Sequence, residues 1–212
     1  MSIGILFDLD GTLLNTLEDL LDATNAALRH FGCPERTLEE LRSFVGNGAR
    51  RLMECAVPEG EDPGKAYALF QGIYAANCQN QTAPYAGIPE ALDRIAGNYP
   101  VAIVSNKPHP AVKELCGKWF PRFYARGEGP LCRRKPDADM VLQTMAHLGV
   151  QSCIYVGDSE VDILTARNAG VPCLSVLWGF RGKDELEAAG GTHFCENPSQ
   201  LEEKIKEILY GK

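Results

Sequence analysis

The sequence predicts a doubly wound α/β fold whose parallel sheet carries an inserted helical subdomain. Short, continuously apolar runs recur along the chain and are followed by helical spacing: Ile3 to Phe7, Val101 to Ser105, Ile154 to Val156 and Cys173 to Leu177. Unbroken apolarity is typical of strands that are covered on both faces, as they are in a parallel sheet. Alternation of such strands with helices favours a doubly wound sheet. The chain between the first two runs is far longer than one crossover connection needs, so we expect an insertion there.

The composition limits the classes of protein and of partner. With 212 residues, 45% of them hydrophobic and 23% charged, the chain is globular, with one large domain or a core with an insertion. A formal net charge of -7 provides no basic field, so we expect no nucleic-acid partner and a locally held anionic substrate. The eight cysteines form no CxxC pair, which favours reduced thiols.

The first apolar run is too short and too charged for a signal peptide or membrane span, so we expect a cytoplasmic protein without a membrane partner. A monomer and a homodimer both remain open.

The insertion has helical spacing in four successive segments: Leu17 to His30, Leu38 to Val45, Ala49 to Cys55 and Gly64 to Asn80. Residues 83–89 then carry the Pro and Gly punctuation of a return linker. We therefore place a helical subdomain at residues 16–82 and a Rossmann-like core at residues 1–15 and 83–212. Further helices are expected at Asp137 to Leu148 and at Pro198 to Leu209.

Two aspartates, Asp8 and Asp10, follow directly after the first apolar run. Open α/β sheets place their ligand crevices at such carboxyl ends of strands. Buried carboxylates are costly unless a cation or hydrogen bonds compensate them. Taken alone, the two residues fit either a ligand site or a plain turn, because Asp10-Gly11 is a common turn dipeptide.

The string from Phe7 to Leu14, FDLDGTLL, closely resembles the first motif of the haloacid dehalogenase-like hydrolase superfamily. The resemblance covers essentially the whole chain and is greatest to the phosphoglycolate phosphatases of that superfamily. It implies that Asp8 is a nucleophile that forms an aspartyl-phosphate. It also implies that Asp10 is the general acid and base, which protonates the leaving alkoxide and then activates water.

Segments that resemble the family's second and third motifs follow in the expected order along the chain. Val104-Ser-Asn-Lys-Pro108 is similar to the second motif, in which Ser105 would donate a hydrogen bond to the phosphoryl group. Asn106 would orient the phosphoryl oxygens and Lys107 would contact the substrate. Arg133-Arg-Lys-Pro136 matches the third motif, in which Lys135 would pair with the phosphoryl group and the nucleophile. Without the resemblance, both segments would be interpreted as exposed loops.

The segment that resembles the fourth motif is Tyr155-Val-Gly-Asp-Ser-Glu-Val-Asp162, an apolar run that ends in acidic residues. Asp158 resembles the magnesium ligand of the family, and Asp162, one helical turn further on, would support the site from behind. The implied Mg²⁺ ligands are Asp8, the backbone carbonyl of Asp10, Asp158 and water. A plain helix cap at Asp158 and Ser159 is the alternative.

The helical insert corresponds to the mobile cap of the family's first cap class, which would exclude water from the site. Within it, Phe44-Val-Gly-Asn-Gly-Ala-Arg50 resembles a glycine-bearing specificity loop. Gly46, Asn47 and Gly48 would contact a small substrate, and Arg50 or Arg51 would pair with its carboxylate. A helix–helix turn with solvated arginines accounts for the same residues. Asn15 departs from the Asp that relatives commonly carry, which concerns the hinge and not the chemistry.

These motifs together predict a Mg²⁺-dependent phosphatase for a small phosphorylated metabolite, with 2-phosphoglycolate favoured. A sugar phosphomutase or a pyrophosphatase would use the same four motifs, and only cap residues would separate them. A dehalogenase is disfavoured because that branch is not expected to keep an acid at Asp10. A non-catalytic phosphometabolite-binding module is the alternative from another class, but it has no chemical reason to retain the whole set.

Overall fold

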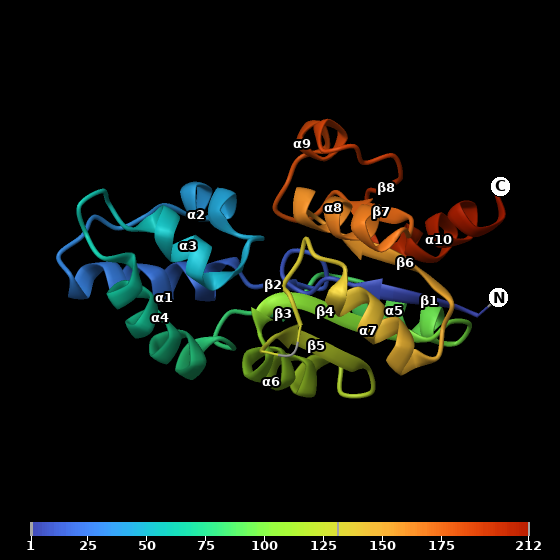
Figure 1. Ribbon diagram of the computed structural model, residues 1–212, viewed down its shortest axis with the longest axis horizontal. Helices are drawn as coiled ribbons and strands as arrows, with labels where there is room; N and C mark the ends of the chain where they lie inside the picture. The colour runs from blue at the N-terminus through green and yellow to red at the C-terminus, as the bar shows by residue number, and fades with distance from the viewer. Residues whose placement is uncertain (1, 131, 212) are drawn as a thin grey trace.

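The computed structural model describes residues 2–130 and 132–211 and contains a six-stranded sheet between layers of helices (Figure 1). The strands lie in the order β5-β4-β1-β6-β7-β8, and each neighbouring pair is parallel. Their bounds are β1 (Ile3–Phe7), β4 (Val101–Pro108), β5 (Tyr124–Glu128), β6 (Ser152–Gly157), β7 (Cys173–Val176) and β8 (Phe194–Cys195). From β1 the chain adds β4 on one side and later returns to add β6 on the other, so the strand order reverses beside β1. The predicted doubly wound fold is confirmed.

Alternate side chains of β1 face opposite layers of the core. Ile5 and Phe7 pack on one face and Leu6 packs on the other, and none of the three is exposed to solvent. Burying one such side chain contributes about 1.5–3 kcal/mol to folding. Burial on both faces explains why this strand is an unbroken apolar run. The surrounding helices are α5 (Ile88–Ala96), α6 (His109–Trp119) and α10 (Leu201–Tyr210) on the first face, and α7 (Asp139–Leu148) and α8 (Glu160–Ala169) on the second.

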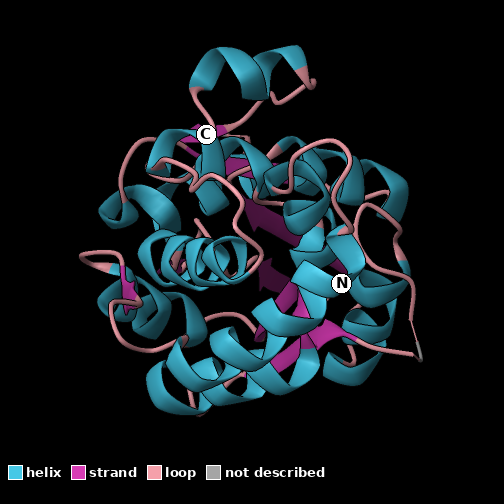
Figure 2. Ribbon diagram, turned by 90° about the vertical axis from the view of Figure 1, so that its left-hand side faces the viewer, coloured by secondary structure: helices cyan, strands magenta, loops and turns pink. Residues whose placement is uncertain are grey.

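Two short strands mark where the chain leaves the core and returns to it. β2 (Leu14–Asn15) pairs antiparallel with β3 (Ala83–Pro84). Between them lie four helices that form a separate lobe in Figure 1, which we call the cap: α1 (Leu17–His30), α2 (Leu38–Phe44), α3 (Gly48–Ala56) and α4 (Pro63–Asn77). Figure 2, viewed from the side of this lobe, shows cap helices in front of the sheet. The cap therefore lies over the carboxyl ends of the strands and not beside an outer strand.

Helices α2 and α4 of the cap begin at residues that cap their N-termini. Thr37 and Glu40 form a capping box at α2, because each side chain bonds the other residue's backbone N–H. Asp62 accepts a hydrogen bond from Gly64 N at the start of α4, where Pro63 occupies the first turn. Two of the four cap helices therefore begin at capping residues that can be identified in the sequence.

The remaining described elements are α9 (Lys183–Ala188), which follows β7, and a short 3₁₀ helix at Pro198–Gln200 before α10. All eight cysteines are free thiols. Among the helices in the described part of the chain, none has the length and apolarity needed to cross a membrane.

Candidate active site

A cavity of about 210 Å³ lies between the carboxyl edge of the sheet and the cap. Its core side is polar and includes most of the residues singled out from the sequence: Asp8, Asp10, Ser105, Asn106, Lys107, Lys135 and Asp158. Its cap side is largely apolar and includes Leu20, Val45, Leu52, Phe70 and Tyr74. Four sequence motifs that are far apart along the chain therefore meet at one cavity, at the edge where parallel sheets bind ligands.

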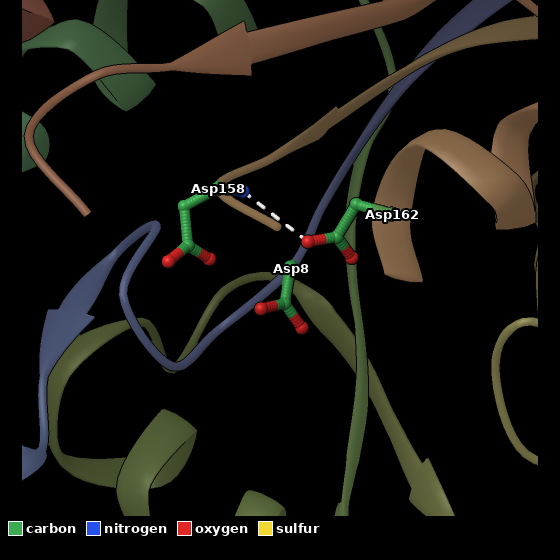
Figure 3. Close-up of side chains that lie close together, drawn as sticks. All are labelled: Asp8, Asp158 and Asp162. Carbon is green, nitrogen blue, oxygen red and sulfur yellow. Dashed lines mark hydrogen bonds between the residues drawn. The ribbon is translucent and has the colours of Figure 1, made fainter. Parts of the chain in front are cut away.

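Three buried carboxylates converge at the base of the cavity (Figure 3). Asp8, Asp158 and Asp162 each place one oxygen within 4.8 Å of the others. Lys135 lies among them, with Nζ 2.6 Å from Asp8 Oδ1 and 2.7 Å from Asp162 Oδ1. One ammonium thus faces three carboxylates.

Asp162 is held on both of its oxygens. Ser159 begins α8, and Asp162 closes a capping box with it, accepting from Ser159 N at 3.1 Å and Ser159 Oγ at 2.7 Å on Oδ2. The same oxygen accepts from Asp158 N at 3.2 Å, the dashed line in Figure 3. Its other oxygen accepts from Lys135. This arrangement suits a residue that orients Asp158 and Lys135.

Asp158 is fixed by two donors from other segments. Thr12 Oγ1 donates to Oδ1 at 3.1 Å, and Phe180 N donates to Oδ2 at 2.7 Å. Burial, followed by the charge of Asp162, raises the pKa of Asp158 to about 7. Burial also raises the pKa of Asp8 well above its usual range, an effect that Lys135 opposes and the neighbouring carboxylates reinforce.

Three buried carboxylates lie close together here and Lys135 is the cation paired with two of them, so their negative charge is only partly compensated. Burial tends to lower the pKa of Lys135, but Asp162 and Asp8 outweigh it and raise that pKa well above its usual range. Lys135 therefore stays protonated and supplies a single positive charge. A cluster of hard carboxylate oxygens with this deficit fits a divalent cation. The residues present therefore suit a metal held by Asp8 and Asp158 and braced by Asp162.

Asp10 points to a second group of residues. Its Oδ1 accepts from Thr16 Oγ1 at 2.7 Å and lies 2.8 Å from Lys107 Nζ, while Ser105 Oγ approaches its Oδ2 at 3.4 Å. Burial tends to lower the pKa of Lys107, but Asp10 and Tyr74 outweigh it and the pKa is raised. The carboxylate of Asp10 is thus presented to the cavity beside a permanent cation.

Asn106 ties three segments together. Its amide nitrogen donates to the carbonyls of Lys135 at 2.9 Å and Gly46 at 3.2 Å. Its Oδ1 accepts from Lys135 N at 2.7 Å. These bonds place Asn106 as a clamp between two core loops and the cap, in addition to its place in the cavity lining.

The cap residues singled out from the sequence divide into two groups. Gly46 and Gly48 line the cavity, whereas Asn47 and Arg50 are not among the described residues that line it. Arg50 is exposed, with its guanidinium 5.3 Å from the centre of the Tyr67 ring. Arg51 is also exposed and pairs with a neighbour on its own helix, Glu54. The structure therefore does not bring either arginine to the cavity.

Two cavity residues escaped the sequence interpretation. Tyr74 of α4 accepts a hydrogen bond from Lys107 Nζ at 2.7 Å, and its ring centre lies 4.6 Å from the same nitrogen. Arg181, in the segment between β7 and α9, is only 8% exposed and reaches the cap. Tyr74 lies in a helical segment of the cap whose pattern does not single it out, and Arg181 lies outside the motifs quoted above. His109 faces away from this chemistry, since its Nδ1 accepts from Gly127 N.

Comparison with known proteins gives a consistent result. The haloacid dehalogenase-like hydrolase family matches residues 5–176. The phosphoglycolate phosphatase of Rhodobacter capsulatus is 35% identical over 200 residues, which cover 89% of this chain and 90% of that protein. The phosphoglycolate phosphatase of Xanthomonas campestris pv. campestris (strain 8004) is 35% identical over 207 residues, covering 93% and 94% of the two chains.

Solved structures agree with this fold. A crystal structure from Lactobacillus delbrueckii subsp. bulgaricus has a TM-score of 0.91 at 33% identity and covers 97% of this chain and 99% of that one. A haloacid dehalogenase-like family protein from Streptococcus pneumoniae has a TM-score of 0.86 at 21% identity, covers 100% and 99% of the two chains, and shows the fold alone. The chain therefore belongs to the haloacid dehalogenase-like hydrolase family, in which it is a phosphoric monoester hydrolase.

Proposed function

We propose that this enzyme is a Mg²⁺-dependent phosphatase that hydrolyses 2-phosphoglycolate through an aspartyl-phosphate on Asp8. The observation that carries the proposal is the Asp8–Lys135 pair, with Nζ 2.6 Å from Oδ1, inside a buried acidic cluster at the carboxyl edge of the sheet. A carboxylate whose first oxygen is held by a lysine is oriented to attack with its second.

The reaction divides into two displacements at phosphorus. In the first, Asp8 Oδ2 forms a bond to phosphorus, the ester P–O bond breaks, and Asp10 gives a proton to the departing alkoxide. In the second, water attacks phosphorus while Asp10 takes its proton, and the bond to Asp8 breaks to release inorganic phosphate. Asp10 must therefore enter the first displacement protonated and the second as a carboxylate, and Thr16, Lys107 and Ser105 orient its side chain in both.

Mg²⁺ would be held by Asp8, the backbone carbonyl of Asp10 and Asp158. When bound, it neutralises the phosphate charge that would otherwise repel the nucleophile. Thr12 and Phe180 N orient Asp158, and Asp162 braces both Asp158 N and Lys135. The chain's own residues thus prepare the site before any phosphate enters.

The substrate is proposed from the charges that face the cavity. Among the described lining residues, Lys107, Lys135 and Arg181 are cationic. Lys135 is committed to two carboxylates, and Arg181 binds Glu160 and carbonyls of the cap. Lys107 gives two of its three N–H donors to Asp10 and Tyr74, which leaves the third for the carboxylate of a small substrate such as 2-phosphoglycolate. The names of the relatives agree with this choice.

The experiment is a panel of phosphorylated metabolites assayed for phosphate release with Mg²⁺ and with excess chelator. We expect 2-phosphoglycolate to have the highest kcat/KM, and no release with chelator. A sugar phosphate that isomerises without releasing phosphate would instead identify a mutase. A higher kcat/KM for a phosphate monoester that lacks a carboxylate, such as ethyl phosphate, would contradict the proposed substrate.

Two variants then separate the candidate carboxylate partners. Lys107→Gln should lower kcat/KM for 2-phosphoglycolate about 10- to 100-fold more than for ethyl phosphate, because a charge-assisted contact is worth about 1.5–3 kcal/mol. Arg50→Ala, which removes an exposed cation of the cap, is the matched comparison. If only Arg50→Ala lowered kcat/KM for 2-phosphoglycolate selectively, Arg50 and not Lys107 would be the partner of the substrate carboxylate.

A further inference from the structure

The side chain of Arg181 connects the core to the cap. It follows β7 in the core, and its Nη1 donates to the carbonyl of Arg42 at 2.8 Å. Its Nη2 donates to the carbonyls of Val45 at 2.8 Å and Ser43 at 3.4 Å. Its Nε donates to Glu160 Oε2 at 3.0 Å on α8. All three guanidinium nitrogens are therefore engaged, in a side chain that is nearly buried.

Two of the cap carbonyls that accept from Arg181 lie at the C-terminal end of helix α2. Arg42 and Ser43 lie in the last turn of α2, where backbone carbonyls have no partner within the helix. This end also carries the negative pole of the helix dipole, which favours a cation. The planar fork of a guanidinium reaches several carbonyls at once, whereas a lysine ammonium is a single point charge. Arg181 thus caps a helix of the other lobe.

The segment that Arg181 holds leads directly into the cavity. Gly46 follows Val45, lines the cavity and adopts φ +123°, which favours glycine. A Cβ at Gly46 would lie 3.8 Å from Arg181 Nη2 and 3.9 Å from Ser159 Oγ, so the loop lies against the core. Asn106 holds the same loop by its bond to the carbonyl of Gly46.

The core backbone next to Arg181 also donates a hydrogen bond to the buried carboxylate cluster of Asp8, Asp158 and Asp162. Phe180 N donates to Asp158 Oδ2, and the next residue is Arg181. Glu160, the partner of Arg181 Nε, lies in the first turn of α8, beside Ser159 and one turn from Asp162. The position of the cap loop is thereby tied to the carboxylates below it.

We infer that Arg181 is a positioning residue that seats the cap loop 42–48 on the core and so shapes the part of the cavity that receives the organic half of the substrate. It acts through the carbonyls of the loop, to which its guanidinium is bonded. The kinetic part of this inference rests on the proposed phosphatase function, and the structural part does not.

The first measurement is backbone hydrogen–deuterium exchange of the substrate-free protein. In Arg181→Met, exchange of residues 42–48 should accelerate about tenfold or more, because a charge-assisted bond is worth about 1.5–3 kcal/mol and several are lost. Exchange in β1 and β6 should stay unchanged. Arg167→Met is the matched control, since Arg167 donates to a core carbonyl, that of Ala189, and is remote from the cap loop.

The second measurement separates KM from kcat. Because Gly46 and Gly48 of the loop line the cavity, Arg181→Met should raise KM for 2-phosphoglycolate about tenfold and change kcat less than about threefold. Arg181→Lys should give an intermediate KM, and Arg167→Met should match the wild type. A fall in kcat at unchanged KM would overturn the inference.

Exchange at wild-type rate in residues 42–48, or acceleration spread evenly through the sheet, would also overturn it. If Arg181→Met does not fold, Arg181→Lys and Glu160→Gln carry the test, and wild-type loop exchange in both would refute the role. Failure of the wild type to hydrolyse 2-phosphoglycolate would reject the proposed substrate, while the exchange measurement would still decide the role of Arg181.

Discussion

Lys135 and Asp8 form a buried ion pair with 2.6 Å between Nζ and Oδ1, and the two side chains are 3% and 9% exposed. The pair joins the loop before α7 to the end of the central strand. Since the pKa of Lys135 is raised by its carboxylate neighbours, the ammonium persists at neutral pH. Asp8, the proposed nucleophile, is therefore oriented and partly neutralised in the absence of substrate.

Replacement of that lysine should be costly in two ways. Lys135→Met leaves the cluster without its cation, and removing one partner of a buried pair costs about 3–5 kcal/mol in the absence of metal. We also expect kcat to fall about 100- to 1,000-fold on 2-phosphoglycolate and on ethyl phosphate alike. Thermal unfolding and steady-state kinetics measure the two effects, with Lys113→Met as an exposed control. A loss confined to one substrate would contradict this role.

The nucleophile can be tested with a nearly isosteric change. Asp8→Asn should abolish turnover, because the amide is a poor nucleophile, and it should retain the fold, because Lys135 keeps its contact with Asp162. Phosphate release and circular dichroism are the measurements, and Asp184→Asn on the exposed face of α9 is the control. Appreciable phosphatase activity in pure Asp8→Asn protein would rule out the covalent route.

The metal site should respond to pH through Asp158. Its pKa is raised from 3.8 to about 7, so the folded protein holds an extra proton between these two values. The contribution of Asp158 to the stability of the metal-free protein should therefore fall as pH rises from about 4 to 7. Mg²⁺ competes with the same proton, so its apparent affinity should increase through this window.

Calorimetric titration of Mg²⁺ at about pH 5.5, 6.5 and 7.5 measures this dependence. Proton uptake by the buffer should accompany binding at the two lower pH values. Asp158→Asn should bind Mg²⁺ weakly at all three and release no proton from this position. Tight binding by Asp158→Asn, or an affinity independent of pH in the wild type, would remove Asp158 from the ligand set.

A tyrosine pair in the cap provides a matched comparison. Tyr74→Phe removes the hydroxyl that accepts from Lys107 and keeps the ring beneath the ammonium. We expect kcat/KM for 2-phosphoglycolate to fall about 3- to 10-fold, which is less than the full worth of a hydrogen bond to a charged group because Lys107 keeps its pair with Asp10. Tyr67→Phe, under exposed Arg50, should have no effect. Equal losses in both variants would indicate a general effect on the cap.

The fold was predictable where burial imposes a pattern. β1 and β6 are covered on both faces, so their apolar runs are continuous in the sequence. β5 is an edge strand with the sequence Tyr-Ala-Arg-Gly-Glu, and β8 has two residues, so neither leaves such a run. Pattern analysis therefore identified four strands and missed the two at the edges.

The site was predictable where chemistry is local to one strand end. Asp8, Asp158 and Lys135 each stand in a short motif whose spacing is preserved in the fold, and the structure brings them together. Tyr74 and Arg181 depend instead on how the cap packs against the core, which involves contacts between segments more than thirty and a hundred residues apart. No pattern within one segment carries that information.

The antiparallel ladder of β2 and β3 also bears on how the chain folds. The central strands β1 and β4 pair Ile5 with Val101, so their contact is non-local and slow to form. The ladder joins Leu14 to Pro84 and shortens that search, because it closes off the cap as a loop of its own. Each doubling of an open loop costs only about 0.6 kcal/mol, but the search also costs time. A chain whose helical lobe and ladder form first has a much shorter effective connection between β1 and β4, as though the lobe were absent.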